Sequence, residues 1–153
     1  MIITGWQSWY NGLKRNNWRE MMKALSIRPD AALNIMLGQK VEEYRTWSTP
    51  YRGDLLICNT AKKIHGTVPG YALCVAKIYD VIERQDADGK YYYAWKIAPF
   101  TKGGSYWIEP IKVKGQLKLF NVDDRLIHPA PFSRIDSKAA AKWLVEKVEP
   151  LVY

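Results

Sequence analysis

Apolar and polar residues alternate over several short segments of the chain, which is the pattern of strands with one buried face. The predicted strands cover residues 23–27, 40–47, 55–58, 71–82, 91–97, 105–108 and 116–121. Asp86 and Gly89 lie between two of these segments, and a glycine that accepts a positive φ suits a hairpin turn there. The sequence therefore predicts six or seven short strands, two of which form a hairpin.

Two segments have the spacing of helices instead. Residues 29–37 begin at Pro29, which suits a first helical turn, and end before Gly38, which tolerates a left-handed conformation. Residues 137–148 form a second predicted helix, with Asp136 or Ser137 as its cap. Strands with helices confined to these segments predict an α+β fold, built on a small β-barrel or strongly curved sheet. A parallel βαβ fold is disfavoured because strands and helices do not alternate regularly.

The first 21 residues are interpreted as an N-terminal extension of a single domain that covers residues 22–153. The extension contains Trp6, Trp9 and Trp18 without a clear period. It either covers one end of the barrel or hangs free, and a short helix from Asn17 into Met21 and Met22 is an alternative within it.

Composition narrows the class of protein. The chain has 153 residues, of which 48% are hydrophobic and 25% charged, as in a folded domain rather than a disordered chain, collagen or coiled coil. No apolar stretch approaches the roughly 20 residues that cross a bilayer. No export signal is recognised at the N-terminus, so we expect a cytoplasmic protein without a membrane partner.

The cysteines and histidines are too few and too scattered for a metal site. Cys58 and Cys74 lie in apolar segments, and His65 and His128 are far apart in the sequence. We expect two buried, reduced thiols, with neither a metal nor another cofactor.

Charge and aromatic content point to an anionic partner. Lys and Arg number 23 against 15 Asp and Glu, which gives a net charge of +8, and the chain has seven Trp and ten Tyr. The excess is +5 in residues 1–63, zero in residues 64–110 and +3 in residues 111–153. Cations neutralise phosphates and flat rings stack on unpaired bases, so RNA or another single-stranded or modified nucleic acid is the expected partner. Solubility and core packing are the structural alternatives for the same residues.

Residues 40–47 break the alternation expected of a half-buried strand. Side chains two apart share a face, so Glu43, Arg45 and Trp47 lie on one side, and Lys40 just precedes the strand. Two cations and a carboxylate therefore meet beside an indole. Broken local rules are typical of functional sites, while a surface ion pair next to a core tryptophan is the alternative.

This segment resembles the signature of the ASCH domain, a PUA-like family. The matching residues are Gly38 and Lys40, then Glu43 and Arg45, then Gly53 at the start of a strand. Further similarity covers the central strand 71–81, Trp95 to Ile97, Ile108 to Pro110, Val113 to Gly115, and Leu119 with Phe120. The resemblance spans residues 22 to about 123.

The resemblance implies a β-barrel of five to seven strands flanked by helices, with a cleft lined by the Lys-Glu-Arg set. Such domains are thought to bind RNA or modified nucleotides, and some members are reported to cleave RNA or to remove an acyl group from a modified cytidine. The acyl-removing members carry a threonine where this chain has Glu43, so that hydroxyl nucleophile is absent here, and Thr46 is predicted on the opposite face.

The candidate nucleic-acid contacts follow from these patterns. Cations contact phosphates or base edges, Glu43 orients them or accepts hydrogen bonds from a base, and the rings either stack or belong to the core. The loop after strand 55–58 extends the basic surface or is simply solvated. The candidates are Lys40, Glu43, Arg45, Trp47, Tyr51, Arg52, Lys62, Lys63 and His65.

Three functions are compatible with this sequence. The first is a domain that binds RNA or a modified nucleotide in a basic cleft. The second is a hydrolase, a ribonuclease or a nucleoside amidohydrolase, with Lys40 as base or nucleophile and Glu43 as its partner. The third is a protein-interaction module that uses the N-terminal tryptophans. The sequence indicates no oligomeric state.

Overall fold

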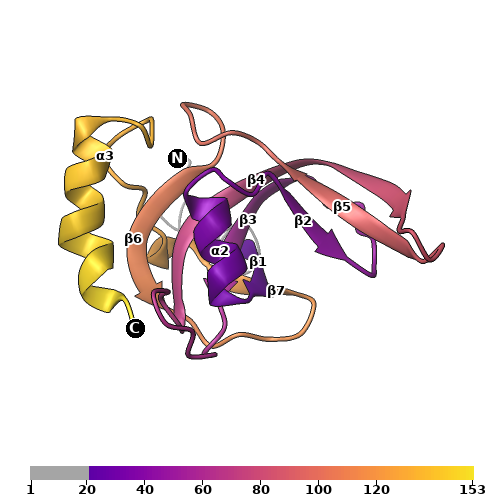
Figure 1. The fold of residues 1–153 in the computed structure, drawn as a ribbon. Helices are drawn as coiled ribbons and strands as arrows, with labels where there is room; N and C mark the ends of the chain where they lie inside the picture. Colours follow the sequence, from indigo (N-terminus) through magenta and orange to yellow (C-terminus); the bar gives the residue numbers. More distant parts are fainter. Residues whose placement is uncertain (1–20) are drawn as a thin grey trace, which may run out of the picture.

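The computed structural model describes residues 21–153 as one seven-stranded, mostly antiparallel sheet with two helices (Figure 1). The strands are β1 (Met21–Ile27), β2 (Glu42–Arg45), β3 (Gly53–Asn59), β4 (Tyr71–Gln85), β5 (Tyr91–Ile97), β6 (Tyr106–Lys112) and β7 (Leu119–Asp123). The helices are α2 (Pro29–Met36) and α3 (Lys138–Trp143), and a π-helical turn (Leu144–Val148) continues α3. The α+β fold class predicted from the sequence is confirmed.

The sheet is barrel-like, but its hydrogen-bonded ladder does not close. The strand order is β2-β5-β4-β3-β1-β7, and β6 pairs separately with β4. Only β1 and β3 are parallel, and helix α2 follows the first of them in the chain. Along this order β2 and β7 are the two end strands, so an open seam separates β2 from the β1–β7 pair.

A proline begins helix α2 and a glycine follows its end, as the sequence predicts. Pro29 occupies the first turn, and Gly38 has a φ of +77° just after the helix. The amide of Lys40 donates a hydrogen bond of 2.9 Å to the carbonyl of Asn34. The left-handed glycine thus reverses the chain and fixes the backbone of Lys40 against the end of the helix.

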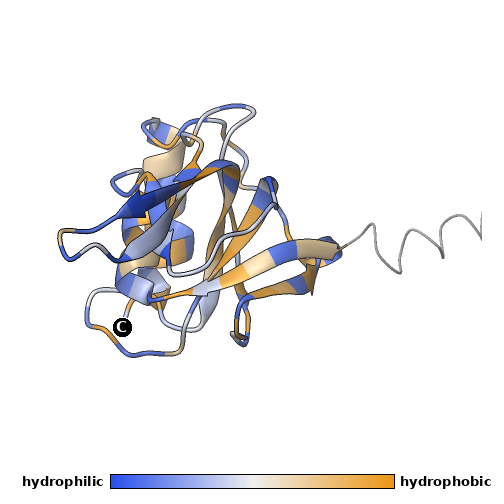
Figure 2. Ribbon diagram, turned by 90° about the vertical axis from the view of Figure 1, so that its right-hand side faces the viewer, coloured by the Kyte–Doolittle hydropathy of each residue, from blue (hydrophilic) through white to orange (hydrophobic). Residues whose placement is uncertain are grey.

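Hydrophobic residues fill both sides of the sheet, and hydrophobic and hydrophilic bands alternate along the strands (Figure 2). Ala32, Ile35 and Met36 of α2 pack into the larger core with the central strands and with Trp143 of α3. Ser137, one of the two predicted caps, accepts a hydrogen bond from the amide of Ala140.

Several predicted boundaries shift. The strand predicted over 40–47 is observed only over β2, the one over 55–58 lengthens to β3, and the one over 116–121 is β7. Strand β6 continues through Pro110, which lies where the register between β4 and β6 shifts, and such an irregularity tolerates a proline. Met21 and Met22 begin β1 and are not helical, so the helix predicted into them is wrong at those residues. Residues 1–20, with Trp6, Trp9 and Trp18, lie outside the described part of the chain.

The β4–β5 hairpin extends away from α3, on the far side of the molecule, and β2 runs along it (Figure 1). Gly89, with a φ of +81°, forms the predicted turn, and Asp86 accepts hydrogen bonds from the amides of Asp88 and Lys90. Trp95 is fully buried whereas Tyr91 is 60% exposed, so only the inner end of β5 contributes to the core.

Candidate nucleic-acid interface

Glu43 on strand β2 is the centre of the candidate site. Its Oε2 lies 2.9 Å from a guanidinium nitrogen of Arg45, and its Oε1 lies 3.6 Å from Nζ of Lys40. The carboxylate side chain is only 11% exposed, and the two cations retain 22% and 23% exposure. A buried carboxylate needs such partners because desolvation penalises an unpaired charge. Two cations share one carboxylate, so the cluster is net positive.

Arg45 also ties the cluster to the other side of the open seam. Its guanidinium donates a hydrogen bond of 2.9 Å to the main-chain carbonyl of Ser26 in β1. The two strands are not neighbours in the ladder, so this side chain bridges a gap that the backbone leaves open. The guanidinium is thereby held in a defined position at the seam.

Trp47 lies beside the cluster and is partly buried. Its ring meets that of Trp95 edge to face, with centroids 4.9 Å apart. The Trp47 ring also contacts a cation, since Nζ of Lys118 lies 4.9 Å from its centroid. Trp47 therefore packs against the core while the loop before β7 adds a third cation beside it.

Glu42 forms a second charged cluster on the opposite face of β2. Arg84 donates two hydrogen bonds to it, at 2.8 and 3.0 Å, and Lys96 lies 2.9 Å away. Tyr44 donates a further hydrogen bond to Glu42. Hydrogen bonds from Arg84 and Lys96 lower the pKa of Glu42 to about 2. Both faces of this short strand therefore carry a carboxylate that is held by two cations.

Lys40 lines a cavity of about 300 Å³ between the end of α2, the end of β5 and residues 134–136. The walls are largely apolar, with Leu37, Val41 and Phe100 among them, and Arg134 contributes a second cation. Such a mixture of apolar wall and a few polar groups is typical of small-molecule sites.

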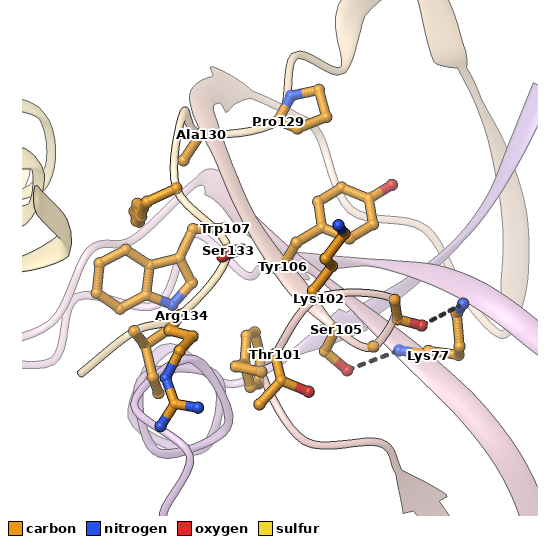
Figure 3. A pocket seen from close by; sticks show the side chains of 15 residues that line it. Lys77, Thr101, Lys102, Ser105, Tyr106, Trp107, Pro129, Ala130, Ser133 and Arg134 are labelled. Carbon is orange, nitrogen blue, oxygen red and sulfur yellow. Dashed lines mark hydrogen bonds between the residues drawn. The ribbon is translucent and has the colours of Figure 1, made fainter. Parts of the chain in front are cut away.

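A second cavity, of about 280 Å³, adjoins the first, because Phe100, Thr101, Arg134 and Ile135 line both. In Figure 3 the indole of Trp107 and the side chain of Arg134 lie across this cavity from Lys77. Lys77 donates from its ammonium to the carbonyl of Gly103 and from its amide to Oγ of Ser105. These contacts fix the loop that forms the wall.

Tyr51 and Arg52 lie outside the Glu43 cluster. The Tyr51 hydroxyl donates to the carbonyl of Asp54, and burial is the main cause that raises its pKa. Arg52 donates to the carbonyl of Thr49 and lies 3.7 Å from Asp80. The structure therefore uses both side chains to hold the loop between β2 and β3 against neighbouring strands.

Lys62, Lys63 and His65 lie on the exposed loop after β3. Lys63 lines a separate open hollow of about 390 Å³ that also contains Gly70 and Tyr153. Its Nζ lies 5.8 Å from the Tyr153 ring, which His65 approaches as well. The structure brings Lys40, Glu43 and Arg45 together, but it groups this loop with the C-terminal residues instead.

Lys118, Arg84, Lys96 and Arg134 are not among the site residues predicted from the sequence. The hairpin turn at Gly89 sets the register between β4 and β5, which offered a signal for Arg84 and Lys96. The pairing of β2 with β5 and the approach of residues 118 and 134 are long-range contacts without a local pattern.

Within residues 21–153, no group of three or more His, Cys, Asp and Glu side chains is arranged to hold a metal ion. Cys58 and Cys74 are buried and form no disulfide, and burial raises the pKa of the Cys58 thiol to about 12. No helix in the same part of the chain has the length and apolar character needed to span a membrane.

Comparison with known proteins supplies a family and a set of similar structures. The model of the ASCH domain matches residues 25–149. The crystal structure of ASCH from Zymomonas mobilis is similar with a TM-score of 0.50 and 13% identity, over 82% of this chain and 94% of that one. Crystal structures of two mutants of that protein, one Tyr to Phe and one Ser to Ala, give TM-scores of 0.50 with 13% and 12% identity. They cover 82% of this chain and 96% and 94% of theirs. No curated protein matches the chain in sequence.

Proposed function

The chain belongs to the ASCH domain family, and from that premise we propose that it binds single-stranded RNA or a modified nucleotide at the Lys40–Glu43–Arg45 cluster and the cavity beside it. The observation that carries the proposal is the position of Lys40. Lys40 belongs to the charged cluster through its ammonium, and the same residue lines the 300 Å³ cavity.

The chemistry of this position suits a nucleotide. Lys40 and Arg134 supply positive charge for phosphate oxygens, while Leu37, Val41 and Phe100 offer apolar walls for a base. Glu43 keeps Lys40 and Arg45 oriented without neutralising both of them. Arg45 and Lys118 continue the positive surface along the seam past Trp47. Phosphate contacts of this kind contribute affinity, whereas the cavity wall contributes the choice of base.

Titration of fluorescent single-stranded RNA at rising salt tests the proposal. Wild type is expected to bind with an affinity that falls as salt rises, because bound phosphates release counterions. Lys40→Ala and Arg45→Ala are expected to weaken binding, and Lys142→Ala, which removes an exposed lysine of α3, serves as the matched control. Undetectable binding, or equal binding by all four proteins, would contradict the proposal.

The hydrolase alternative predicted from the sequence uses the same residues. Glu43 is committed to two cations and Lys40 to Glu43, so this geometry favours holding an anion over attacking a substrate. Incubation with labelled RNA and with acylated nucleosides separates the two functions. A product that wild type forms and Lys40→Ala does not would establish the enzyme.

A further inference from the structure

We propose that the outer face of the β2–β5–β4 sheet is a second contact surface, on which bases of a single-stranded nucleic acid stack as the strand leaves the Lys40 cluster. The inference rests on the proposed function, since it describes where the flanking nucleotides go. It assigns a surface formed by Tyr44, Tyr79, Tyr92, Arg84 and Lys96, which we call the tyrosine face.

The pairing register places these side chains on one face. Tyr44 lies opposite Ala94, which lies opposite Ile82 on β4, and alternation puts Tyr92 and Lys96 on the same side of β5 as Ala94. Arg84 lies opposite Tyr92 and reaches Glu42 across the face. Glu43, Trp95 and Tyr91 are on the other side of the sheet by the same register.

A β-bulge adds the third ring. The register shifts between Ile78 and Asp80, and the extra residue there is Tyr79, whose side chain is 55% exposed. Bulges re-aim side chains next to functional sites. The bulge sets Tyr79 directly before Asp80, which lies opposite Lys96 on β5.

Single exposed rings are ordinary on a folded domain, but several exposed rings gathered on one face indicate a contact surface. Tyr44 is 51% exposed and meets Tyr92 edge to face at 5.6 Å, so its ring faces outward over a packed neighbour. The adjacent charges are Arg84 and Lys96 against Glu42, and Arg52 against Asp80, so three cations surround two carboxylates. Aromatic rings among excess cations fit the bases and phosphates of a single strand.

Lys40 connects the tyrosine face with the Lys40–Glu43–Arg45 cluster and its cavity. Nζ of Lys40 lies 4.4 Å from the centroid of the Tyr44 ring on one side and 3.6 Å from Glu43 on the other. Within residues 21–153, β2 pairs with β5 alone, so its other edge lies between the Glu43 side of the sheet and the tyrosine face. A single-stranded nucleic acid that contacts Lys40 therefore needs only to cross this edge of β2 to reach the tyrosine rings.

The inference is tested by measuring, side by side, the affinities for a dinucleotide and for a single-stranded RNA of ten nucleotides. The dinucleotide is long enough to occupy only the Lys40–Glu43–Arg45 cluster and its cavity, whereas the longer RNA also reaches the tyrosine face. We expect the longer RNA to bind at least about tenfold more tightly to wild type. Tyr79→Ala and Tyr44→Ala should each lose about fivefold or more for the long RNA, since stacking on one ring contributes that order of affinity. Tyr79→Phe should bind like wild type because the ring remains.

Tyr91→Ala is the matched control, because Tyr91 is 60% exposed but lies on the opposite side of the sheet. Equal affinity for both lengths, or a long-RNA affinity unchanged in Tyr79→Ala and Tyr44→Ala, would overturn the inference while leaving the proposed function intact. A loss shared equally by both lengths would also overturn it. Binding of neither length would remove the proposed function together with the inference. Self-association that Tyr79→Ala abolishes, with RNA binding unchanged, would assign the face to a second copy instead.

Discussion

Strands β2 and β3 show two opposite ways of building the same sheet. β3 lies between β1 and β4, and its residues from Leu55 to Asn59 are all buried. β2 has one neighbour, and its buried residues are the carboxylates Glu42 and Glu43, each 8% exposed. β3 combines pairing on both edges with mainly apolar burial, while β2 is held by buried carboxylates whose cationic partners are more exposed. Burial in β3 therefore stabilises the fold, whereas β2 holds the charged groups that we propose contact a ligand.

The largest expected effect is on β3. Leu56→Ala should lower the free energy of unfolding by about 2–5 kcal/mol, because Leu56 is completely buried and the truncation leaves a cavity. Urea denaturation followed by tryptophan fluorescence measures the change. Leu117→Ala, at a position that is 92% exposed, is the control and should leave the midpoint in place. Equal losses in both variants would erase the distinction between core and surface on which the comparison depends.

A smaller loss of stability is expected on β2. Glu42→Gln should cost about 1–3 kcal/mol, because Arg84 and Lys96 lose the charge that they share. The hydrogen bonds from Arg84 and Lys96 lower the folded-state pKa of Glu42 from its ordinary value of 4.5 to about 2, so its contribution is complete above pH 4.5 and is lost as pH falls toward 2. The difference between the denaturation midpoints of the two proteins should therefore be constant above pH 5 and become smaller between pH 4.5 and pH 3. A constant difference across that range would show that the carboxylate charge does not stabilise β2.

Affinity, rather than stability, should respond to Lys40. Lys40→Ala is expected to weaken RNA binding about fivefold and to reduce the salt slope by about 0.7, as for one lost phosphate contact on a single strand. Its unfolding free energy should change by less than about 1 kcal/mol, since Lys40 is a partly exposed ion-pair partner. Binding and denaturation measured on the same preparation separate the two effects. A large loss of stability with unchanged affinity would show that Lys40 stabilises the fold and does not bind RNA.

The smallest effect is expected on the loop after β3. Lys62→Ala and Lys63→Ala should change RNA affinity by less than about twofold, because this loop packs beside Tyr153 rather than beside Lys40. Salt screens charges beyond about 8–10 Å at physiological ionic strength. Anisotropy titration measures both variants. A loss as large as that of Lys40→Ala would extend the binding surface to the opposite end of β3.

The two regions also differ in how well the sequence predicts them. Apolar runs, Pro29, Gly38 and the turn at Gly89 are local signals, so β3, α2 and the β4–β5 hairpin are predicted within a few residues. The meeting of Lys40, Glu43 and Arg45 was also predicted, because alternation along one strand places the last two on a shared face. The hairpin turn sets the register of Arg84 and Lys96 on β4 and β5, but their approach to β2 is a long-range contact. Lys118 and Arg134 come from distant segments, and no local pattern indicates that they reach β2 or its cavity. The barrel was predicted, but the open seam depends on strand order, which alternation does not encode.

Mapping of bound RNA by NMR tests most directly the claim that β2 and its flanks carry the function. Amide shifts of the labelled protein are followed while a short single-stranded RNA is added at low salt. We expect the largest changes at residues 38–47, with further changes at residues 97–101 and 134–136, which line the adjoining cavity. The amide signals of residues 62–65 and of the buried part of β3 should not shift. Changes confined to residues 60–70, or no change at any RNA concentration, would contradict it.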